Sequence, residues 1–210
     1  MSSAVFCFVF IGFINFSPVI GRFKHIYFRM KKAFLFLANG FEESEAIVPS
    51  DILLRGNVEL VLVSVTGKKE VLGAHNIAVM ADRLFDECDF SAADMLILPG
   101  GMPGAKNLNE HNGLKTLLAG FAKQGGLIAA ICAAPLVLGG LGLLKGRKAT
   151  CYPGFESYLE GATCTAQPVE AAGTIITGRD PGNAYNFGFT LLTALMGEDV
   201  AREVEAGMFP

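Results

Sequence analysis

Apolar runs alternate with helical patterns along most of the chain. Continuous apolar runs predict buried parallel strands at residues 33–38, 58–65, 95–98 and 127–131. Apolar residues at helical spacing predict helices at residues 42–55, 114–123, 136–144, 183–196 and 199–206. Strands that alternate with helices in this way predict an α/β fold, a doubly wound sandwich with a mainly parallel central sheet.

Residues 66–80 depart from this alternation. Gly67-Lys68-Lys69 is typical of a turn, and short β-like pieces flank the stretch 73–76. We therefore expect a β-hairpin excursion from the sheet. Shorter elements are expected as a turn or helix at 82–85, an extended piece at 149–152, a short helix at 155–159, and strands at 169–170 and 174–177.

The first 29 residues differ from the rest of the chain. Residues 1–21 carry no charge and are rich in Phe, and three basic residues follow. An ordinary signal peptide has its positive charge before the apolar run, which argues against one here. Three readings stay open: a translation start at Met30, a membrane anchor or unusual signal, or an extra folded element. We expect residues 30–210 to form a single domain and residues 1–29 to carry no chemistry.

Composition narrows the classes of function. The chain has 210 residues, 51% of them hydrophobic, and a net charge of −3, which argues against a nucleic-acid partner. Its five cysteines are odd in number and match no zinc spacing, and its three histidines are scattered. These features predict reduced thiols in a cytoplasmic protein, with no metal site. A membrane contact is expected only if residues 1–29 belong to the protein.

A single cysteine follows the predicted strand 127–131. That strand ends at Cys132, and two alanines and Pro135 lead into the next predicted helix. The order of strand, nucleophile, small residue and helix is that of a nucleophile elbow, in which a tight turn lifts the reactive side chain out of the sheet. The start of the helix would favour a thiolate. A buried core cysteine fits the stretch equally well.

Glu45 is a candidate acid beside this cysteine, since the carboxyl ends of parallel strands meet at one edge of a sheet. It lies in the helix that follows the strand 33–38. Beside a thiolate its carboxyl would tend to be protonated, and it could donate to the sulfur or shuttle a proton. Glu42 and Glu43, in the first helical turn, are expected to face water. Spacing alone also fits a solvated helix-face acid at Glu45.

Gly100 and Gly101 follow the predicted strand 95–98 at the same edge. Glycines allow the backbone to approach closely, so the N–H of Gly101 and that of Ala133 could hold an oxyanion. An ordinary strand-to-helix turn would have the same sequence.

Three stretches together resemble the ThiJ/PfpI superfamily: LANGFEESE at 37–45, LPGGMPGA at 98–105 and AICAAP at 130–135. The resemblance runs from Met30 to about Phe209. It implies a flavodoxin-like sandwich, usually a homodimer, without a metal or an organic cofactor. It assigns the nucleophile to Cys132, the partnering acid to Glu45, and the oxyanion donors to Gly101 and Ala133.

The chain departs from the family pattern at two histidine positions. Ala133 stands where family proteases have histidine, which argues against a peptidase. Tyr152 stands where glyoxalase-like and deglycase-like members have histidine, and a phenol is a poor base near neutral pH. Glu45 would therefore have to do more of the proton transfer.

Further positions are expected near the site. His75 stands where relatives have an arginine in the hairpin, and it is expected near the site of a partner subunit. With Gly100 and Tyr152 it is expected to line the pocket. Residues 179–182 resemble an Arg-Gly-Pro-Gly segment of the family, with Asp180 in place of a glycine.

The resemblance implies a cofactor-free cysteine enzyme of the glyoxalase or deglycase type. Its substrates would be small reactive aldehydes, such as methylglyoxal and glyoxal, or glycated protein groups. Cys132 would add to the aldehyde, and Glu45 would move the proton. A second hypothesis is an oxidative-stress sensor or chaperone, in which Cys132 is oxidised to a sulfinic acid. A role in thiamine biosynthesis has little support, because the chain has no phosphate-binding loop.

Overall fold

A seven-stranded sheet forms the centre of the computed structural model, which describes residues 29–209. The strand order is β10-β11-β7-β6-β1-β2-β5, and every neighbouring pair is parallel except β10 with β11. The strands are β1 (Lys32–Leu37), β2 (Glu59–Ser64), β5 (Arg83–Leu84), β6 (Met95–Leu98), β7 (Leu127–Ile131), β10 (Val169–Ala172) and β11 (Ile175–Gly178).

The chain winds outward from the middle of this sheet in both directions. It starts at β1, builds β2 and β5 on one side, and then returns to build β6, β7 and β11 on the other. Strand β6 and residues 33–37 of β1 are buried throughout, as expected for strands that are covered on both faces. The predicted doubly wound α/β sandwich is confirmed, and its switch point lies between β1 and β6.

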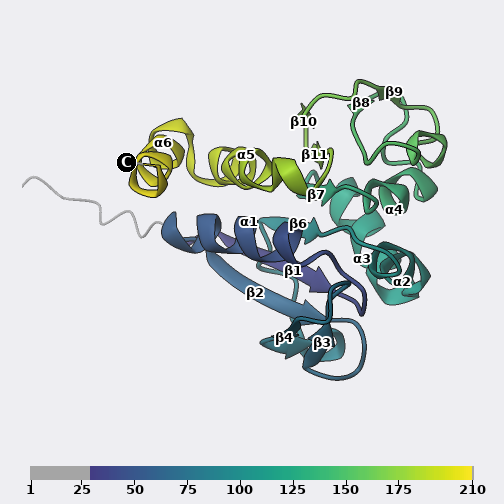
Figure 1. Cartoon of the computed structure of the whole chain (residues 1–210), viewed down its shortest axis with the longest axis horizontal. Coiled ribbons are helices and arrows are strands. Elements are labelled where there is room, and N and C mark those ends of the chain that lie inside the picture. Colours follow the sequence, from purple (N-terminus) through teal and green to yellow (C-terminus); the bar gives the residue numbers. More distant parts are fainter. Residues whose placement is uncertain (1–28, 210) are drawn as a thin grey trace, which may run out of the picture.

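Helices pack in two groups around the sheet (Figure 1). The first group is α1 (Glu43–Arg55), α5 (Ala184–Met196) and α6 (Glu198–Met208), and the second is α2 (Gly104–Glu110), α3 (Asn112–Lys123) and α4 (Pro135–Gly140). Helices α1 and α5 run side by side (Figure 1) and approach closely at Gly188, where a Cβ atom would lie 2.6 Å from Ile52 Cδ1. The absence of a side chain at Gly188 thus sets the spacing of the two helices.

The predicted hairpin is present as an antiparallel pair, β3 (Glu70–Leu72) and β4 (Ala78–Met80). Its loop is tied to the turn after β1, because Gly40 N–H donates to Leu72 O at 2.8 Å and Ala74 N–H donates to Phe41 O at 2.8 Å. The hairpin therefore lies next to the start of α1.

Two helical predictions differ from the structure. Helix α2 was not expected, since a glycine and two asparagines give the stretch 104–110 low helix propensity. The helix expected over 136–144 ends at Gly140, because Gly142 adopts a positive φ of 69°. Its last turn also approaches a neighbouring segment so closely that a side chain on Gly139 would overlap Tyr158 O.

The shorter elements differ in part from what the sequence predicts. The stretch expected as a turn or helix at 82–85 is the two-residue strand β5, followed by a short helix at Phe85–Glu87. The extended piece expected at 149–152 pairs only at β8 (Lys148–Ala149) with β9 (Thr163–Cys164), a strand that was not predicted. A single helical turn at Glu156–Tyr158 lies between them.

The expectations for residues 1–28 lie outside the described residues. Arg29 contacts the domain, since its guanidinium binds the Asp94 carboxylate at 2.8 Å. In residues 29–209, every helix is too short or too polar to cross a bilayer.

Candidate functional site

Cys132 sits at a strained turn directly after β7. Its φ of 63° is in the left-handed region, which costs a residue with a side chain about 1–2 kcal/mol. Two hydrogen bonds hold this turn: Cys132 N–H donates to Gly178 O at 3.0 Å, and Tyr152 N–H donates to Cys132 O at 2.8 Å. The backbone of the predicted elbow is thus fixed from both sides by neighbouring segments, as is typical of functional turns.

Backbone N–H groups from two strand ends approach the Cys132 sulfur. They belong to Gly101, which follows β6, and to Ala133, which follows the cysteine itself. Gly101 has a φ of 84°, and a side chain on it would overlap the backbone at Glu42. Only glycine therefore lets this N–H reach the sulfur. The two donors that the sequence suggested converge on one atom.

Glu45 is fully buried in the first turns of α1. Its Oε2 accepts the N–H of Gly100 at 2.8 Å, while Oε1 has no hydrogen-bond partner among the described residues. Burial raises the pKa of Glu45 to about 7, against the lowering effect of Cys132 and Gly100, and the charges on Glu42 and Asp180 raise it further. A carboxyl of this pKa can both take and give a proton near neutral pH.

The surroundings of the Cys132 thiol disfavour its ionisation. Burial raises its pKa, and the carboxylate of Glu45 raises it further, whereas the N–H groups of Gly101 and Ala133 lower it. Burial acts against the thiolate that the following helix is expected to favour, and this helix, α4, has six residues. The thiol therefore needs a nearby base, and Glu45 is the adjacent one.

Gly100 lets the thiol and the carboxyl meet. A Cβ atom at this position would lie 2.6 Å from Glu45 Oε2 and 2.7 Å from Cys132 Cβ. Any side chain there would separate the two groups or displace one of them. The segment after β6 thus contributes the backbone N–H groups of Gly100 and Gly101. It also leaves space at Gly100 in which the Glu45 carboxyl and the Cys132 thiol lie close together.

The expectation that Glu43 faces water is wrong. Its side chain is 10% exposed, because the loop of the β3–β4 hairpin covers it. Glu43 accepts the backbone N–H of His75 at 2.7 Å, and its Oε2 lies 2.7 Å from His75 Nδ1. Burial raises the pKa of Glu43, but these hydrogen bonds lower it more. His75 therefore binds an acid of its own chain, while 66% of its side chain stays exposed.

Glu42, Glu43 and His75 also bring three potential metal-ligand atoms within 4.8 Å of one another. The carboxylate of Glu43 already accepts hydrogen bonds from the hairpin backbone and from the imidazole. The group acts as a tie between the hairpin and α1, with its ligand atoms engaged in hydrogen bonds.

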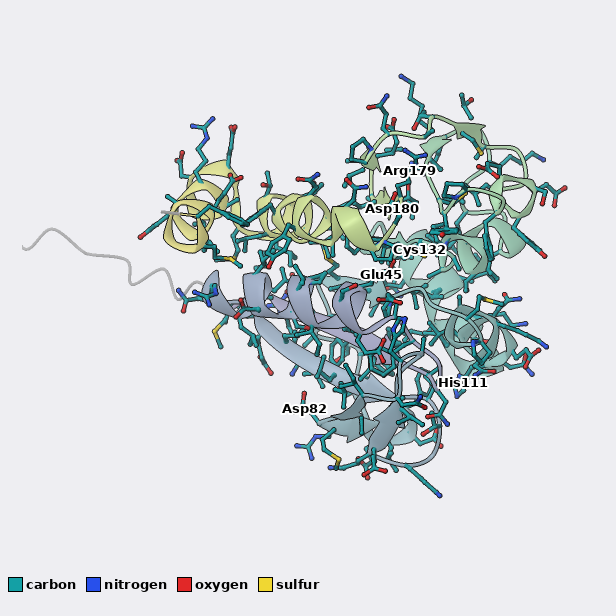
Figure 2. All side chains as sticks on the ribbon, in the orientation of Figure 1. Glu45, Asp82, His111, Cys132, Arg179 and Asp180 are labelled. Atoms are coloured by element: carbon teal, nitrogen blue, oxygen red, sulfur yellow. The ribbon has the colours of Figure 1, made fainter. Side chains whose placement is uncertain are left out.

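Tyr152 lies beside the elbow through its backbone. Its ring is 43% exposed and packs edge-on against Phe155, with the ring centroids 6.4 Å apart. Asp180 is held by Asn183, whose Nδ2 donates to Oδ1 at 2.8 Å, and its charge raises the pKa of Glu45. Figure 2 shows Cys132, Glu45 and Asp180 close together at this edge of the sheet.

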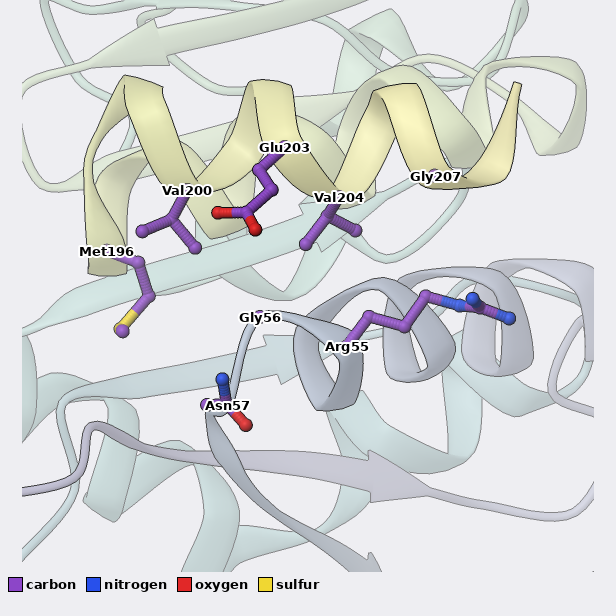
Figure 3. A pocket seen from close by; sticks show the side chains of 8 residues that line it. All are labelled: Arg55, Gly56, Asn57, Met196, Val200, Glu203, Val204 and Gly207. Atoms are coloured by element: carbon purple, nitrogen blue, oxygen red, sulfur yellow. The ribbon is translucent and has the colours of Figure 1, made fainter. Parts of the chain in front are cut away.

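His111 and a cavity at the far end of α1 lie away from this edge. His111 is half-buried and caps α3, since its Nδ1 accepts the N–H of Leu114 at 3.0 Å. A cavity of about 410 Å³ lies between α6 and the end of α1, beside Arg55, Val200 and Glu203 (Figure 3). It is at the opposite end of α1 from Glu45, so it is unconnected with the elbow.

Sequence reasoning missed the residues that hold the elbow from outside. Gly178 accepts the Cys132 N–H through its carbonyl, and a carbonyl oxygen leaves no signature in a sequence. The buried Thr150 and the guanidinium of Arg179 were also not expected to share a cavity next to this turn.

Comparisons with known proteins agree with the geometry. A family model described as the DJ-1/PfpI family matches residues 31–194. The chain is 40% identical over 176 residues to Protein DJ-1 homolog B of Arabidopsis thaliana, covering 83% of this chain and 40% of that relative. It is 32% identical over 159 residues to the Glutathione-independent glyoxalase DJR-1.2 of Caenorhabditis elegans, covering 75% of this chain and 84% of that protein.

A solved structure described as Toxoplasma gondii DJ-1, oxidized, has the same fold. It superposes with a TM-score of 0.82 at 33% identity, over 85% of this chain and 98% of that one. Against the two Arabidopsis relatives, by contrast, the chain spans less than half of the relative's length.

Proposed function

The chain belongs to the DJ-1/PfpI family, and on this premise we propose that it is a cofactor-free cysteine enzyme acting on small reactive carbonyl compounds. Methylglyoxal and glyoxal, or their adducts on proteins, are the proposed substrates. One observation supports this most: the buried carboxyl of Glu45, whose Oε1 has no hydrogen-bond partner among the described residues, lies beside the Cys132 thiol at Gly100. The glyoxalase name of one relative agrees with it.

In the first proposed step, the sulfur of Cys132 bonds to the aldehyde carbon of methylglyoxal. Glu45 takes the thiol proton and passes it to the former aldehyde oxygen, which gives a hemithioacetal. The N–H groups of Gly101 and Ala133 hold that oxygen while it carries negative charge. Such donors are effective because they are fixed in place before the reaction.

The second step is an internal proton transfer. The Glu45 carboxylate removes the proton from the carbon bound to sulfur and returns it to the neighbouring carbonyl carbon, while the hydroxyl proton of the hemithioacetal moves to the former ketone oxygen. The hemithioacetal becomes a thioester of lactic acid, so one carbon is oxidised as the other is reduced and no external redox partner is needed. Water then cleaves the thioester, which releases lactate and restores the Cys132 thiol.

Methylglyoxal turnover by three proteins tests the proposal. The wild type is expected to form lactate, Cys132→Ser is expected to lose at least ~100-fold of kcat, and Cys88→Ser, altered away from the site, serves as the matched control. Equal turnover by the wild type and Cys132→Ser would overturn the assignment of the nucleophile. No turnover by any of them would overturn the reaction.

Oxidation of Cys132 is a second candidate function. The observation that favours it is the pair of N–H groups on the sulfur, which suits a sulfinate oxygen, and one structural neighbour is described as oxidized. Peroxide titration with intact mass and peptide mapping tests it. Cys132 must oxidise before the exposed Cys164, and the reverse order would remove this function.

We also propose that the protein is a homodimer that uses the outer face of the β3–β4 hairpin. Leu72 and Met80 lie on that face and are 45% and 62% exposed, and Ile77 in the loop is 57% exposed. Burying such apolar side chains against a second copy is favourable.

Residues 30–210 are proposed to be sufficient for folding and activity as one domain. A chain that begins at Met30 is expected to retain the turnover of the full chain. Loss of folding in that shorter chain would contradict this domain boundary.

A further inference from the structure

Asp180 places a carboxylate beside the pair formed by Glu45 and Cys132. The segment that carries Asp180 follows β11 and is bonded to the elbow, because Gly178 O accepts the Cys132 N–H at 3.0 Å. Asp180 comes two residues after Gly178, and Figure 2 shows it near Cys132 and Glu45. Its charge also acts on the Glu45 carboxyl, whose pKa it raises. Asp180 thus lies at the candidate site, on the side of β11.

The structure fixes this carboxylate in place and leaves it in contact with water. Asn183 Nδ2 donates to Asp180 Oδ1 at 2.8 Å, and a Cβ atom on Gly182 would lie only 3.2 Å from the same oxygen. The side chain of Asp180 is 24% exposed. Contact with water favours the charged form of a carboxyl group, so Asp180 supplies a positioned negative charge.

The ion-pair partner of Asp180 extends toward a different space. Arg179 Nε lies 3.8 Å from Asp180 Oδ2, which is beyond hydrogen-bond distance. The side chain of Arg179 lines a small cavity of about 160 Å³ together with Thr150 and Cys151, and Asp180 is not part of that lining. The guanidinium therefore serves the cavity, whereas the carboxylate acts on Glu45.

A second carboxylate, that of Glu42, acts on the same carboxyl from the start of α1. His75 Nδ1 lies 3.7 Å from Glu42 Oε2 and offsets this charge when the imidazole is protonated. Cys132 is only 7% exposed, so a small molecule that reaches its sulfur passes close to the side chains around it. A molecule with a permanent negative charge would meet the field of Asp180 there.

We propose that Asp180 is a specificity-determining residue, which favours uncharged α-oxoaldehydes at Cys132 over α-oxoaldehydes that carry a carboxylate or a phosphate group. The choice of substrate class rests on the proposed function, whereas the selection against anions at the thiol does not. A glycine at this position, as in the segment that residues 179–182 resemble, would lack the selection. The carboxylate of the lactate product meets the same repulsion, which favours its release.

Iodoacetamide and iodoacetate test the selection without turnover. Both alkylate a thiolate by displacing iodide, and only iodoacetate is an anion. Rate constants at Cys132 are measured by peptide mass spectrometry and divided by those of mercaptoethanol. In dilute buffer we expect a preference for iodoacetamide of at least about fivefold, as for two like charges several ångströms apart near a protein surface. Salt at about 1 M shortens the Debye length to about 3 Å and should remove most of this preference.

Asp180→Asn removes the charge and keeps an oxygen that can accept from Asn183. It is expected to lower the preference at least about threefold, and Asp180→Gly should do the same if the amide fails to fold. Asp199→Asn is the matched control: it removes one negative charge from an exposed position on α6, which packs at the end of α1 remote from Glu45. An equal preference in the wild type and both Asp180 variants, or an equal loss in Asp199→Asn, overturns the proposal.

Turnover of two matched substrates tests the substrate class. Propylglyoxal is uncharged, and its analogue with a carboxylate in place of the terminal methyl group has the same reacting carbons. The wild type is expected to have a kcat/KM at least about fivefold lower for the anion, and Asp180→Asn should narrow the difference. Equal kcat/KM values in the wild type overturn the specificity role. If neither compound is turned over while the alkylation preference depends on Asp180, the proposed function fails and the selection at the thiol stands.

Discussion

Glu45 and Cys132 both lie against Gly100: a methyl group on its α-carbon would lie 2.6 Å from Glu45 Oε2 and 2.7 Å from Cys132 Cβ. The acid comes from the helix after β1 and the thiol from the turn after β7, which are far apart in the chain. They meet because β6 lies between these two strands and Gly100 follows its end.

The first prediction concerns that glycine. Gly100→Ala is expected to reduce kcat/KM for methylglyoxal at least ~100-fold and to destabilise the fold by about 1–3 kcal/mol, because the added methyl group overpacks the site. Denaturant unfolding and steady-state kinetics measure the two effects. Gly120→Ala is the control: its Cβ meets open space inside α3, so it is expected to keep activity and to gain up to about 1 kcal/mol.

Glu45 should make the stability of the protein depend on pH. Its pKa is about 7 in the folded chain and 4.5 as a free group, so the folded chain holds this proton more tightly. The resulting stabilisation is fully present below pH 4.5 and is lost as the pH rises through about 7. Relative to Glu45→Gln, the wild type is expected to lose about 3 kcal/mol of unfolding free energy over that range. Parallel pH profiles for the two proteins would contradict the raised pKa.

The same carboxyl should set the pH dependence of the rate. Thiolate attack requires that the Cys132–Glu45 pair lose one of its two protons. We therefore expect kcat/KM to rise about tenfold per pH unit below pH 7 and to level off above it. Glu45→Gln removes the base, so kcat/KM of this variant is expected to be much lower and nearly independent of pH below pH 7. If kcat/KM of Glu45→Gln still rose with pH around the same midpoint, the pH dependence would belong to another group.

His75 should stabilise the fold most in mildly acidic solution. Its hydrogen bond to Glu43 raises the pKa of His75 above 6.5, so its contribution is full below 6.5 and is lost as the pH rises through the raised value. The lowered pKa of Glu43 makes its contribution full above 4.5. His75→Asn is therefore expected to lower Tm more at pH 5.5 than at pH 9.

Arg202→Gln is the control for His75, because it breaks an exposed ion pair with Glu198 that contains no histidine. Its effect on Tm is expected to be small and equal at the two pH values. If His75→Asn lowered Tm equally at pH 5.5 and at pH 9, the charge on the imidazole would make no contribution to stability.

The last prediction concerns the proposed homodimer. Met80→Glu places a charge on the outer face of the hairpin and is expected to convert the proposed dimer into a monomer in analytical ultracentrifugation. Ile47→Glu, at an exposed position on α1 and outside the hairpin, is the comparison. A wild type that sediments as a monomer, or a dimeric Met80→Glu, would refute the hairpin as the interface.

The layout of the sheet could be predicted because its strands are buried on both faces. The stretches 95–98 and 127–131 match β6 and β7 residue for residue, since nothing but continuous burial selects such apolar runs. Helix α2 could not be predicted in the same way. Gly104, its first residue, packs so closely on the backbone of Gly40 that tertiary contact rather than helix propensity decides its conformation.

The main residues of the candidate site were visible in the sequence because they follow strand ends. Cys132 and Gly101 come just after β7 and β6, Glu45 lies in the helix that follows β1, and the topology brings those strand ends together. The direction in which the folded structure shifts the pKa of the Cys132 thiol could not be predicted from the sequence. Burial decides it, and burial depends on how the segments after β8 and β11 cover the turn.

The contact between Glu43 and the hairpin has a mechanical consequence. Glu43 lies two residues before Glu45 in the same turn of α1 and accepts hydrogen bonds from the hairpin loop, which also binds the turn after β1. Displacement of the hairpin tip thus pulls on the acid that serves the thiol. A second copy seated on the hairpin would stiffen this linkage, so the affinity of assembly and the turnover of each copy should vary together.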